Sequence, residues 1–434
     1  MMRTFLAVPF VRDIATMQAG RIVNIGCGFL SSILYARILG LSGYGEYAVV
    51  LAFTGTFGLF TNLGQQATTL TFFSEAYGRK DRQALAQILQ YYLVLSACAA
   101  LLLGLLALLS PMLTAIIYGD DSIGQLTRIV FISSICELGF IYLSIVLQTV
   151  RKIRLLTLLE NAKIVLQLGL STFFLLLGFS VAGILWSSLI AAVLFSSVSC
   201  LLYPKLRANY DLPPVREALR AGNRTMFWKY TKDGLWIAMD KSLGNLYPNI
   251  FLFALSTQVR GAIVGSLRLA FKLGELPSSF GLSSIGRLAS SVLPSVAGRG
   301  HDVLRSKIRK LATHTIAMHG FITLCGLLII PPLLPIVYGE QFGIATYPFI
   351  VIAILNLSLA LHALATPVLR VYSKIWMAAV LSAVGTLAGL GLFFTLGEML
   401  RPTWALYIAL LVYHIIIGLV FVPVLKIVRT QQIQ

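Results

Sequence analysis

Long apolar stretches alternate with short polar connections along the whole chain. One stretch from Gln83 to Gly119 contains no charged side chain. About 20 apolar residues are enough to cross the hydrocarbon core of a bilayer as a helix. The pattern predicts about twelve such helices, near residues 17–39, 47–70, 88–117, 126–149, 155–177, 181–203, 234–255, 261–292, 311–337, 345–369, 375–396 and 403–425.

These stretches are predicted to be helices because a backbone inside lipid has to satisfy its own hydrogen bonds. Membrane-spanning strands would instead appear as short segments of alternating polarity, which the sequence lacks. Composition agrees with this interpretation: 58% of the residues are hydrophobic and 12% are charged, and the mean hydropathy is +0.86. Soluble domains carry about 25% charged residues. We therefore expect an all-α polytopic membrane protein.

The net charge of +18 could indicate nucleic-acid binding, but the cations are distributed in another way. Most Lys and Arg residues fall in every second connection or near the ends of the chain: Arg3 and Arg12, Arg79 to Arg82, Arg151 to Arg154, Lys205 to Lys232, Arg299 to Lys310, Arg370 and Lys374, Lys426 and Arg429. The opposite connections hold only Arg260 and Arg401 as cations, together with Glu46, Asp120, Asp121, Glu340 and Glu398. This bias predicts that both termini are cytoplasmic, and it excludes one continuous nucleic-acid surface.

Signals for targeting, cofactors or catalysis are weak. The segment FLAVPFV is followed by Arg12 and Asp13 without a cleavage-like site, so we expect no removable signal peptide. The five cysteines all fall inside predicted helices without a CxxC pair, which favours a packing role over disulfides or metal ligands. Motifs for nucleotide, zinc or serine-nucleophile chemistry are missing from the sequence. We expect no enzyme activity, no catalytic residues, no metal site and no cofactor.

Two halves of the chain repeat each other at an offset of about 220 residues. SPMLTAIIYGDD (110–121) corresponds to IPPLLPIVYGEQ (330–341), so that Tyr118 and Gly119 align with Tyr338 and Gly339. The same offset aligns further positions without a gap: Gly78-Arg79 with Gly298-Arg299, Gly45 with Gly265, and Arg21 with Lys241. In this interpretation a helix ends on the outer face near Pro111, and Tyr118 lies at the membrane interface.

The repeat predicts the domain organisation. Residues 1–203 form an N-terminal six-helix lobe, 204–232 a basic cytoplasmic linker with a break at Pro213-Pro214, and 233–434 a C-terminal six-helix lobe. Six spans return the chain to the same side of the membrane, so both lobes share one orientation and are related by a pseudo-two-fold axis along the membrane normal. Transporters with such repeats bind their substrates between the repeats and alternate the access to that site.

Charged residues inside the spans are the candidates for that site. A charge at mid-span costs about 2.5–3.5 kcal/mol on insertion scales, so such residues usually face a protein interior or a water-filled cavity. Arg268, Lys272 and Glu275 share one helical face. The other charged candidates, with the polar residues that share their helical faces, are Arg21 with Asn24, Asp240 with Lys241, Glu160 with Lys163 and Gln167, and Glu137 alone.

Two interpretations of these charges remain open. They can pair with one another or reach the nearer membrane surface, which we favour for Arg37, Arg128 and Arg287 near span ends. For Arg268, Lys272 and Glu275, and also for Arg21, we favour a position in the lining of a cavity. The charges of such a cavity are basic on balance, which suits phosphate or pyrophosphate. The predicted substrate-binding residues are Arg21, Asn24, Lys241, Arg268 and Lys272, and the candidates for ion coupling are Glu137, Glu160, Asp240 and Glu275.

Four stretches carry a resemblance to a known family: RILGLSGYGEYAVV (37–50), NLGQQATTL (62–70), VGSLRLAFKLGELP (264–277) and IVYGEQF (336–342). They resemble the polysaccharide-export branch of the multidrug/oligosaccharidyl-lipid/polysaccharide exporter superfamily, the Wzx-type O-antigen flippases. The resemblance extends over essentially the whole chain.

The resemblance implies a MATE-like fold and a bacterial inner-membrane flippase for surface polysaccharide (lipopolysaccharide) synthesis. It implies that a polyprenyl-pyrophosphate-linked oligosaccharide moves from the cytoplasmic to the outer leaflet through a basic inter-lobe cavity. It also implies a lipid-linked glycan and a polysaccharide polymerase complex as partners.

Two alternatives are weighed against a flippase. An ion-coupled small-molecule or multidrug exporter of the same fold would place an acid on the first span, where this chain has Arg21 and Asn24. A membrane-embedded glycosyltransferase or polymerase would need a catalytic carboxylate or a large extramembrane loop. The longest connection here is the basic linker, whose acids are Asp211, Glu217 and Asp233.

Overall fold

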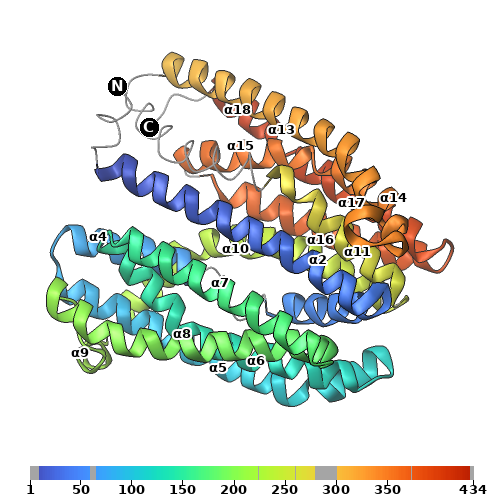
Figure 1. Ribbon diagram of the computed structural model, residues 1–434. Coiled ribbons are helices and arrows are strands. Elements are labelled where there is room, and N and C mark those ends of the chain that lie inside the picture. Colours follow the sequence, from blue (N-terminus) through green and yellow to red (C-terminus); the bar gives the residue numbers. More distant parts are fainter. Residues whose placement is uncertain are drawn as a thin grey trace. The chain divides into compact units, whose positions relative to one another are not determined.

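The computed structural model describes residues 9–58, 65–222, 224–259, 261–278, 301–372 and 374–430 (Figure 1). Within these ranges the regular structure is helical, and no strand is present. Nine helical runs in this part of the chain are long and apolar enough to cross a membrane. The prediction of an all-α polytopic membrane protein is confirmed.

Most of the predicted spans coincide with helices. Within the described residues, the structure divides the predicted spans 47–70, 345–369 and 403–425 into two helices each, and it joins the first two spans in one bent helix. Helix α2 (Pro9–Phe57) runs from the first predicted span into the second and changes direction at Gly40, where φ is 67° and ψ is 179°. Glycine adopts a positive φ at little cost because it has no Cβ. The second predicted span, 47–70, is also divided, since α2 ends at Phe57 and α4 (Gln65–Gly78) follows. Of the predicted span 261–292, the described part forms α11 (Ala262–Gly274), and residues 279–300 lie outside the described residues.

The chain divides into two compact units. The first comprises Met1–Leu39 and Phe53–Ala238, and the second comprises Gly40–Ala52 and Met239–Gln434. The borders of these units fall inside α2 and inside α10 (Arg224–Ser256). The lobe boundaries expected at residues 203 and 233 stay a prediction. The sequence alone did not indicate that the short piece 40–52 packs with the C-terminal part of the chain.

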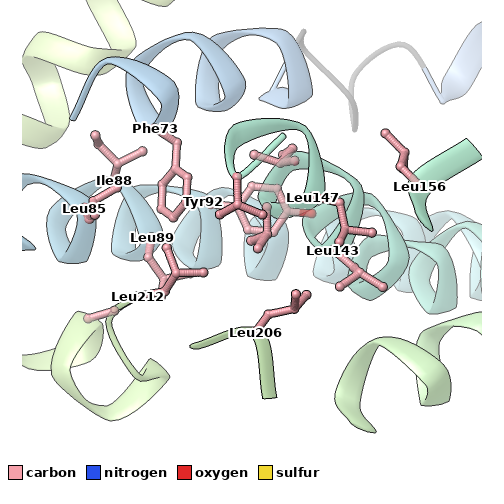
Figure 2. Close-up of a cluster of buried hydrophobic side chains, with 14 of the residues drawn as sticks. Phe73, Leu85, Ile88, Leu89, Tyr92, Leu143, Leu147, Leu156, Leu206 and Leu212 are labelled. Atoms are coloured by element: carbon pink, nitrogen blue, oxygen red, sulfur yellow. The ribbon is translucent and has the colours of Figure 1, made fainter. Parts of the chain in front are cut away.

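The first unit is built around α5 (Arg82–Tyr118), α6 (Ser122–Thr149) and α8 (Ser180–Tyr210), with α7 (Ile153–Leu176) packed on α8. Its core holds side chains from all of these helices and from α4, among them Phe73, Leu89, Tyr92, Leu147 and Leu206 (Figure 2). Leu212 and Ala218 of the predicted linker belong to the same cluster. The short helix α9 (Val215–Arg220) is therefore fixed to the bundle and packs on α5.

Local interactions explain where α5 begins and ends. The Asp81 side chain accepts a hydrogen bond from the Ala84 amide at 2.9 Å, which satisfies one of the free N–H groups of the first turn. Gly119 ends the helix in the left-handed conformation, with its N–H donating to the Ala115 carbonyl. The next helix, α6, packs tightly against the last turns of α5, since a Cβ on Gly124 would lie 2.3 Å from Pro111 Cα.

Besides α11 and the C-terminal part of α10, the second unit contains the helices that follow them in the sequence. They are α13 (His301–Tyr338), the 3-10 helix η2 (Glu340–Ala345), α14 (Thr346–Leu355), α15 (Ser358–Val371), α16 (Trp376–Gly397), α17 (Pro402–Gly418) and α18 (Phe421–Thr430). Helix α17 packs along α16 and α15, and α11 packs along α14. One core of this unit joins α13, α15, α16 and α18 through residues that include Ile308, Leu369, Ala378 and Val424.

Segment 40–52 crosses α11 at backbone distance. A Cβ on Gly45 would lie 2.0 Å from the Gly261 carbonyl oxygen, and one on Gly265 would lie 2.7 Å from the Leu41 carbonyl oxygen. The two contacts are equivalent under the repeat, because Leu41 corresponds to Gly261 and Gly45 to Gly265 at the 220-residue offset. In each contact the glycine of one repeat lies against the carbonyl group of the other repeat. Glycine allows helices to approach this closely. The two repeats thus contribute equivalent glycines to one crossing.

The repeat is also visible where α5 and α13 end. Both helices end at a tyrosine, and each is followed by a glycine with positive φ, 66° at Gly119 and 105° at Gly339. Tyr118 and Tyr338 are buried within the protein, at 7% and 2% exposed, and the expected position of Tyr118 at the membrane interface stays a prediction. Tyr118 packs near Phe53, with ring centroids 6.4 Å apart.

Candidate functional site: the basic face of helix α11

Helix α11 is buried on most of its surface, and its charges occupy the part that stays open. Val264 to Leu267 and Leu269 to Phe271 are buried, whereas Arg268 and Lys272 are half-buried and Glu275 is exposed. Near Gly265 the same face is covered by segment 40–52. The predicted alignment of Arg268, Lys272 and Glu275 on one face is therefore present, and the face is open only in its C-terminal half.

Arg268 is oriented by a neighbouring helix. Its Nη1 donates a hydrogen bond to Asn249 Oδ1 on α10 at 3.1 Å. Lys272 and Glu275 make no ion pair within the described part of the chain, although both are close enough to Arg268 to interact with it electrostatically. One carboxylate faces two cations there, so the group keeps an excess positive charge. Such a pair of bases one turn apart matches the oxygens of a phosphate or diphosphate.

A buried polar network holds the C-terminal end of α11. Asn356, between α14 and α15, donates from Nδ2 to the Gly274 carbonyl at 2.9 Å. Its Oδ1 lies 3.4 Å from the Tyr247 hydroxyl, which in turn lies 2.7 Å from His414 Nε2. His414 Nδ1 lies 2.7 Å from Ser358 Oγ. Buried polar groups in such a connected network rigidify their surroundings, so the network fixes the helix that carries Arg268 and Lys272.

Arg21 and Asn24 belong to the first unit, on the N-terminal part of α2. Arg21 is half-buried and Asn24 is exposed. The side chains of Asp240 and Lys241 lie outside the described side chains, although their backbone is part of α10. The binding roles of Arg21, Asn24 and Lys241 and the coupling role of Asp240 stay predictions.

Glu137 and Glu160, the other coupling candidates, lie near Lys163 in the first unit. Glu137 on α6 forms an ion pair with Lys163 on α7, and the Lys163 ammonium lies 5.3 Å from the centroid of the Phe140 ring. The Lys163 side chain is 14% exposed and that of Glu137 is 39% exposed. Glu160 is exposed one turn before Lys163. Glu137 and Lys163 thus pair with each other, as the first of the two interpretations of the intramembrane charges describes. The coupling roles of Glu137 and Glu160 stay predictions.

The sequence did not indicate Asn249 or the Tyr247–Asn356–His414 network as part of the site. Two of the histidines, His319 and His414, are buried, at 1% and 3% exposed. The available signal was a polar residue within a strongly apolar run, as at Asn356 in AILNLSLAL. Many such residues only bond to their own helix, as Ser144 does, so the signal does not identify a partner.

Comparison with known proteins agrees with this architecture. The family model described as "Polysaccharide biosynthesis protein" matches residues 10–290, whereas no curated protein matches the sequence. A MOP superfamily transporter from Pyrococcus furiosus Vc1 (DSM3638), whose title speaks of a reverse polarity of the binding pocket, is 16% identical. It aligns over 98% of this chain and 97% of its own, with a TM-score of 0.67.

Multidrug transporters share the fold as well. The inward-facing structure of a multidrug resistance MATE family transporter of the MOP superfamily is 14% identical and aligns over 95% of this chain and 99% of its own, with a TM-score of 0.65. A MATE transporter in complex with MaD5 is 15% identical, with coverages of 98% and 97% and a TM-score of 0.67. These likenesses show the fold, and the family match covers well over half of the sequence. The chain is a multi-pass membrane protein with a MATE-like fold that belongs to the polysaccharide biosynthesis protein family.

Proposed function

We propose that this membrane protein is a flippase that moves a polyprenyl-pyrophosphate-linked oligosaccharide from the cytoplasmic to the outer leaflet of a bacterial inner membrane. The basic face of α11 carries the proposal, because Arg268 and Lys272 present two bases one turn apart within a polysaccharide biosynthesis protein. The bases hold the pyrophosphate, and the lipid tail stays in the bilayer. The glycan then serves surface polysaccharide synthesis, with a polysaccharide polymerase complex as the next partner.

Asn249 fits this role as an aid to Arg268. A guanidinium held by an amide oxygen keeps its remaining N–H groups for a ligand and loses less side-chain freedom when the ligand binds. Glu275 balances part of the charge while the site is empty. When a phosphate arrives, repulsion between the two anions favours a protonated Glu275, which couples binding to a proton. The protein binds no metal and performs no covalent chemistry in this scheme.

Substitutions on α11 test the proposal through export of the lipid-linked glycan. Loss of one hydrogen bond to a charged group costs about 1.5–3 kcal/mol, roughly 10- to 150-fold in affinity. Arg268→Ala should therefore reduce export severely at normal protein levels, as should Lys272→Ala. Arg268→Lys should keep part of the activity, because the charge stays but the two-pronged hydrogen bonding is lost.

The control is Arg305→Ala, which removes an exposed cation from α13 and should leave export unchanged. Export is measured by complementation of a flippase-deficient strain and by quantifying the lipid-linked intermediate that accumulates. If Arg268→Ala and Lys272→Ala both export at the normal rate, the face is structural and the proposed site is wrong.

An ion-coupled exporter of small molecules is the second candidate, favoured by the likeness to multidrug MATE transporters. A cell that lacks the protein distinguishes the two functions. A flippase predicts that a lipid-linked oligosaccharide accumulates and that sensitivity to cationic drugs is unchanged. An exporter predicts that no lipid-linked oligosaccharide accumulates and that sensitivity to cationic drugs increases.

A further inference from the structure

The linker helix α9 exposes two different stripes to its surroundings. Val215 and Leu219, four residues apart, are 43% and 63% exposed. Arg216 and Arg220, also four residues apart, form a parallel exposed stripe. Residues four apart lie on one face of a helix, so an apolar and a basic stripe run side by side. We call Val215, Arg216, Leu219 and Arg220, together with the exposed Trp228 eight residues further along the chain, the linker surface.

The remaining faces of α9 fix it to the end of the bundle. Ala218 is fully buried, and Glu217 accepts hydrogen bonds from Arg82 at the start of α5 at 3.0 and 3.2 Å. After the helix, Gly222 approaches Gln90 of α5 closely. The next helix continues this attachment, since the rings of Phe227 and Tyr91 have centroids 5.2 Å apart. Helix α9 is thus attached to the bundle beside α5 (Figure 1).

Acids in this region are already engaged. Arg82 forms ion pairs with both Asp211 and Glu217. Among the described residues, Arg216 and Arg220 form no ion pair, and neither do Lys205 and Lys229 on either side. The cations of the linker surface are therefore left for an anion outside the protein.

The exposed apolar side chains next to these cations indicate that the anion also carries apolar groups. Trp228 is 60% exposed, while its neighbour Phe227 packs on α5. Exposed Leu and Trp side chains beside arginines, here Leu219 on α9 and Trp228 on α10, are typical of segments that lie in the membrane interface. The apolar groups of such segments lie at the acyl-chain boundary and the cations at the headgroups. Near an anionic leaflet each such cation contributes favourably to binding. A free anion in water would leave Val215, Leu219 and Trp228 uncovered.

We propose that the linker surface binds acidic phospholipid headgroups of the adjacent leaflet, which the distribution of cations predicts to be the cytoplasmic one. The bound lipid lies along α9 with its phosphate between Arg216 and Arg220 and its chains against Leu219 and Trp228. This binding anchors the connection between the two units of the chain to one membrane surface. It does not depend on the transported substrate.

Native mass spectrometry of the full-length protein tests this proposal with added phosphatidylglycerol or phosphatidylcholine. The double substitution Arg216→Gln/Arg220→Gln should weaken the tightest phosphatidylglycerol binding by roughly 10- to 30-fold, because two cations near the headgroup are removed. Phosphatidylcholine binding should be unchanged, and Arg216→Lys/Arg220→Lys should retain the affinity. Leu219→Asn should also weaken binding, since an apolar contact with the chains is lost.

The matched control is Arg305→Gln/Arg309→Gln, which removes two exposed arginines with the same four-residue spacing from α13. Equal loss of phosphatidylglycerol binding in both double variants would overturn the proposal, as would unchanged binding in Arg216→Gln/Arg220→Gln. Glycerol phosphate, the headgroup without chains, should not displace the lipid at equal concentration. Displacement would assign the arginines to a soluble anion instead. Equal thermal midpoints in neutral detergent establish that every variant is folded.

Discussion

At the scale of single residues, the buried hydroxyl of Tyr247 connects the parts of the second unit that surround the end of α11. It lies between His414 Nε2 and Asn356 Oδ1, and the Asn356 amide bonds to the last turn of α11. The Tyr247 ring also stacks on Tyr413 with centroids 4.5 Å apart. Packing and hydrogen bonding therefore coincide in one side chain, and two conservative substitutions can separate them.

Tyr247→Phe keeps the ring and removes the hydroxyl, so His414 Nε2 loses its partner in a buried place. An unsatisfied buried polar group costs about 1–3 kcal/mol, and we expect a correspondingly lower thermal unfolding midpoint in detergent. Tyr413→Phe is the control, because it removes a hydroxyl from the stacked ring without a hydrogen bond to another described residue. Equal midpoints for the two variants would show that the network contributes little.

At the scale of secondary-structure elements, the crossing of segment 40–52 over α11 depends on glycine. With 2.0 Å between a Cβ at position 45 and the Gly261 carbonyl oxygen, any side chain requires the two backbones to separate. The crossing covers the N-terminal half of the α11 face and leaves Arg268 and Lys272 open. Close contact between helices of one unit thus decides which part of a charged face remains accessible.

Gly45→Ala should separate the crossing and lower the thermal midpoint, since overpacking of a tight contact costs about 1–3 kcal/mol. Gly26→Ala is the matched control on the same helix, because a Cβ there meets nothing within 4 Å. The control should be neutral or slightly stabilising, as alanine favours a helix by about 0.5–1 kcal/mol over glycine. Opposite signs for the two variants are the expected result, and equal signs would contradict the close crossing.

The attachment of α9 to α5 should depend on pH. Hydrogen bonds from the Arg82 guanidinium hold the pKa of the Glu217 carboxyl below its ordinary value of 4.5. A lowered pKa in the folded state stabilises the attachment at every pH above the ordinary value, and this contribution is lost as the pH falls through the lowered one. Its size is small because both side chains are partly exposed to water.

Acidification from pH 6 to pH 3 should therefore make α9 more accessible to proteolysis in the unmodified protein. In Glu217→Gln the accessibility should already be raised at pH 6 and should change less with pH. Glu398→Gln, which alters an exposed carboxyl on a different connection, is the control and should behave like the unmodified protein. Identical pH profiles for Glu217→Gln and the unmodified protein would show that this pair does not hold α9.

At the scale of the whole molecule, the distribution of Lys and Arg predicts the orientation in the membrane. A reporter that is active only in the cytoplasm should be active when fused after Arg309, because that connection is rich in cations. The same reporter fused after Glu340, at the start of η2, should be silent. The reverse pattern would contradict the orientation and would also place the linker surface of α9 against the outer leaflet.

Much of the architecture follows from the sequence because each spanning helix is favoured on its own. Inserting an apolar stretch into lipid is a property of that stretch, so hydropathy located the helices that the structure contains, and the repeated Tyr-Gly located the ends of α5 and α13. The common face of Arg268, Lys272 and Glu275 also follows from helical periodicity alone. The break after Phe57 did not follow, because it lies inside the apolar stretch 47–70, where hydropathy shows no boundary. The change of direction at Gly40 lies in the gap between the predicted spans 17–39 and 47–70, although hydropathy does not show that one bent helix continues through this gap.

Tertiary structure alone decided which residues meet. The sequence by itself determined the membrane class, the positions of the helices, the repeat and the charged face of α11. Its partner Asn249, the Asn356 bond to Gly274, the burial of Tyr118 and the packing of segment 40–52 with the second unit all depend on how helices rotate and cross. Those angles result from many small packing contacts between distant segments, and no single stretch of sequence contains them.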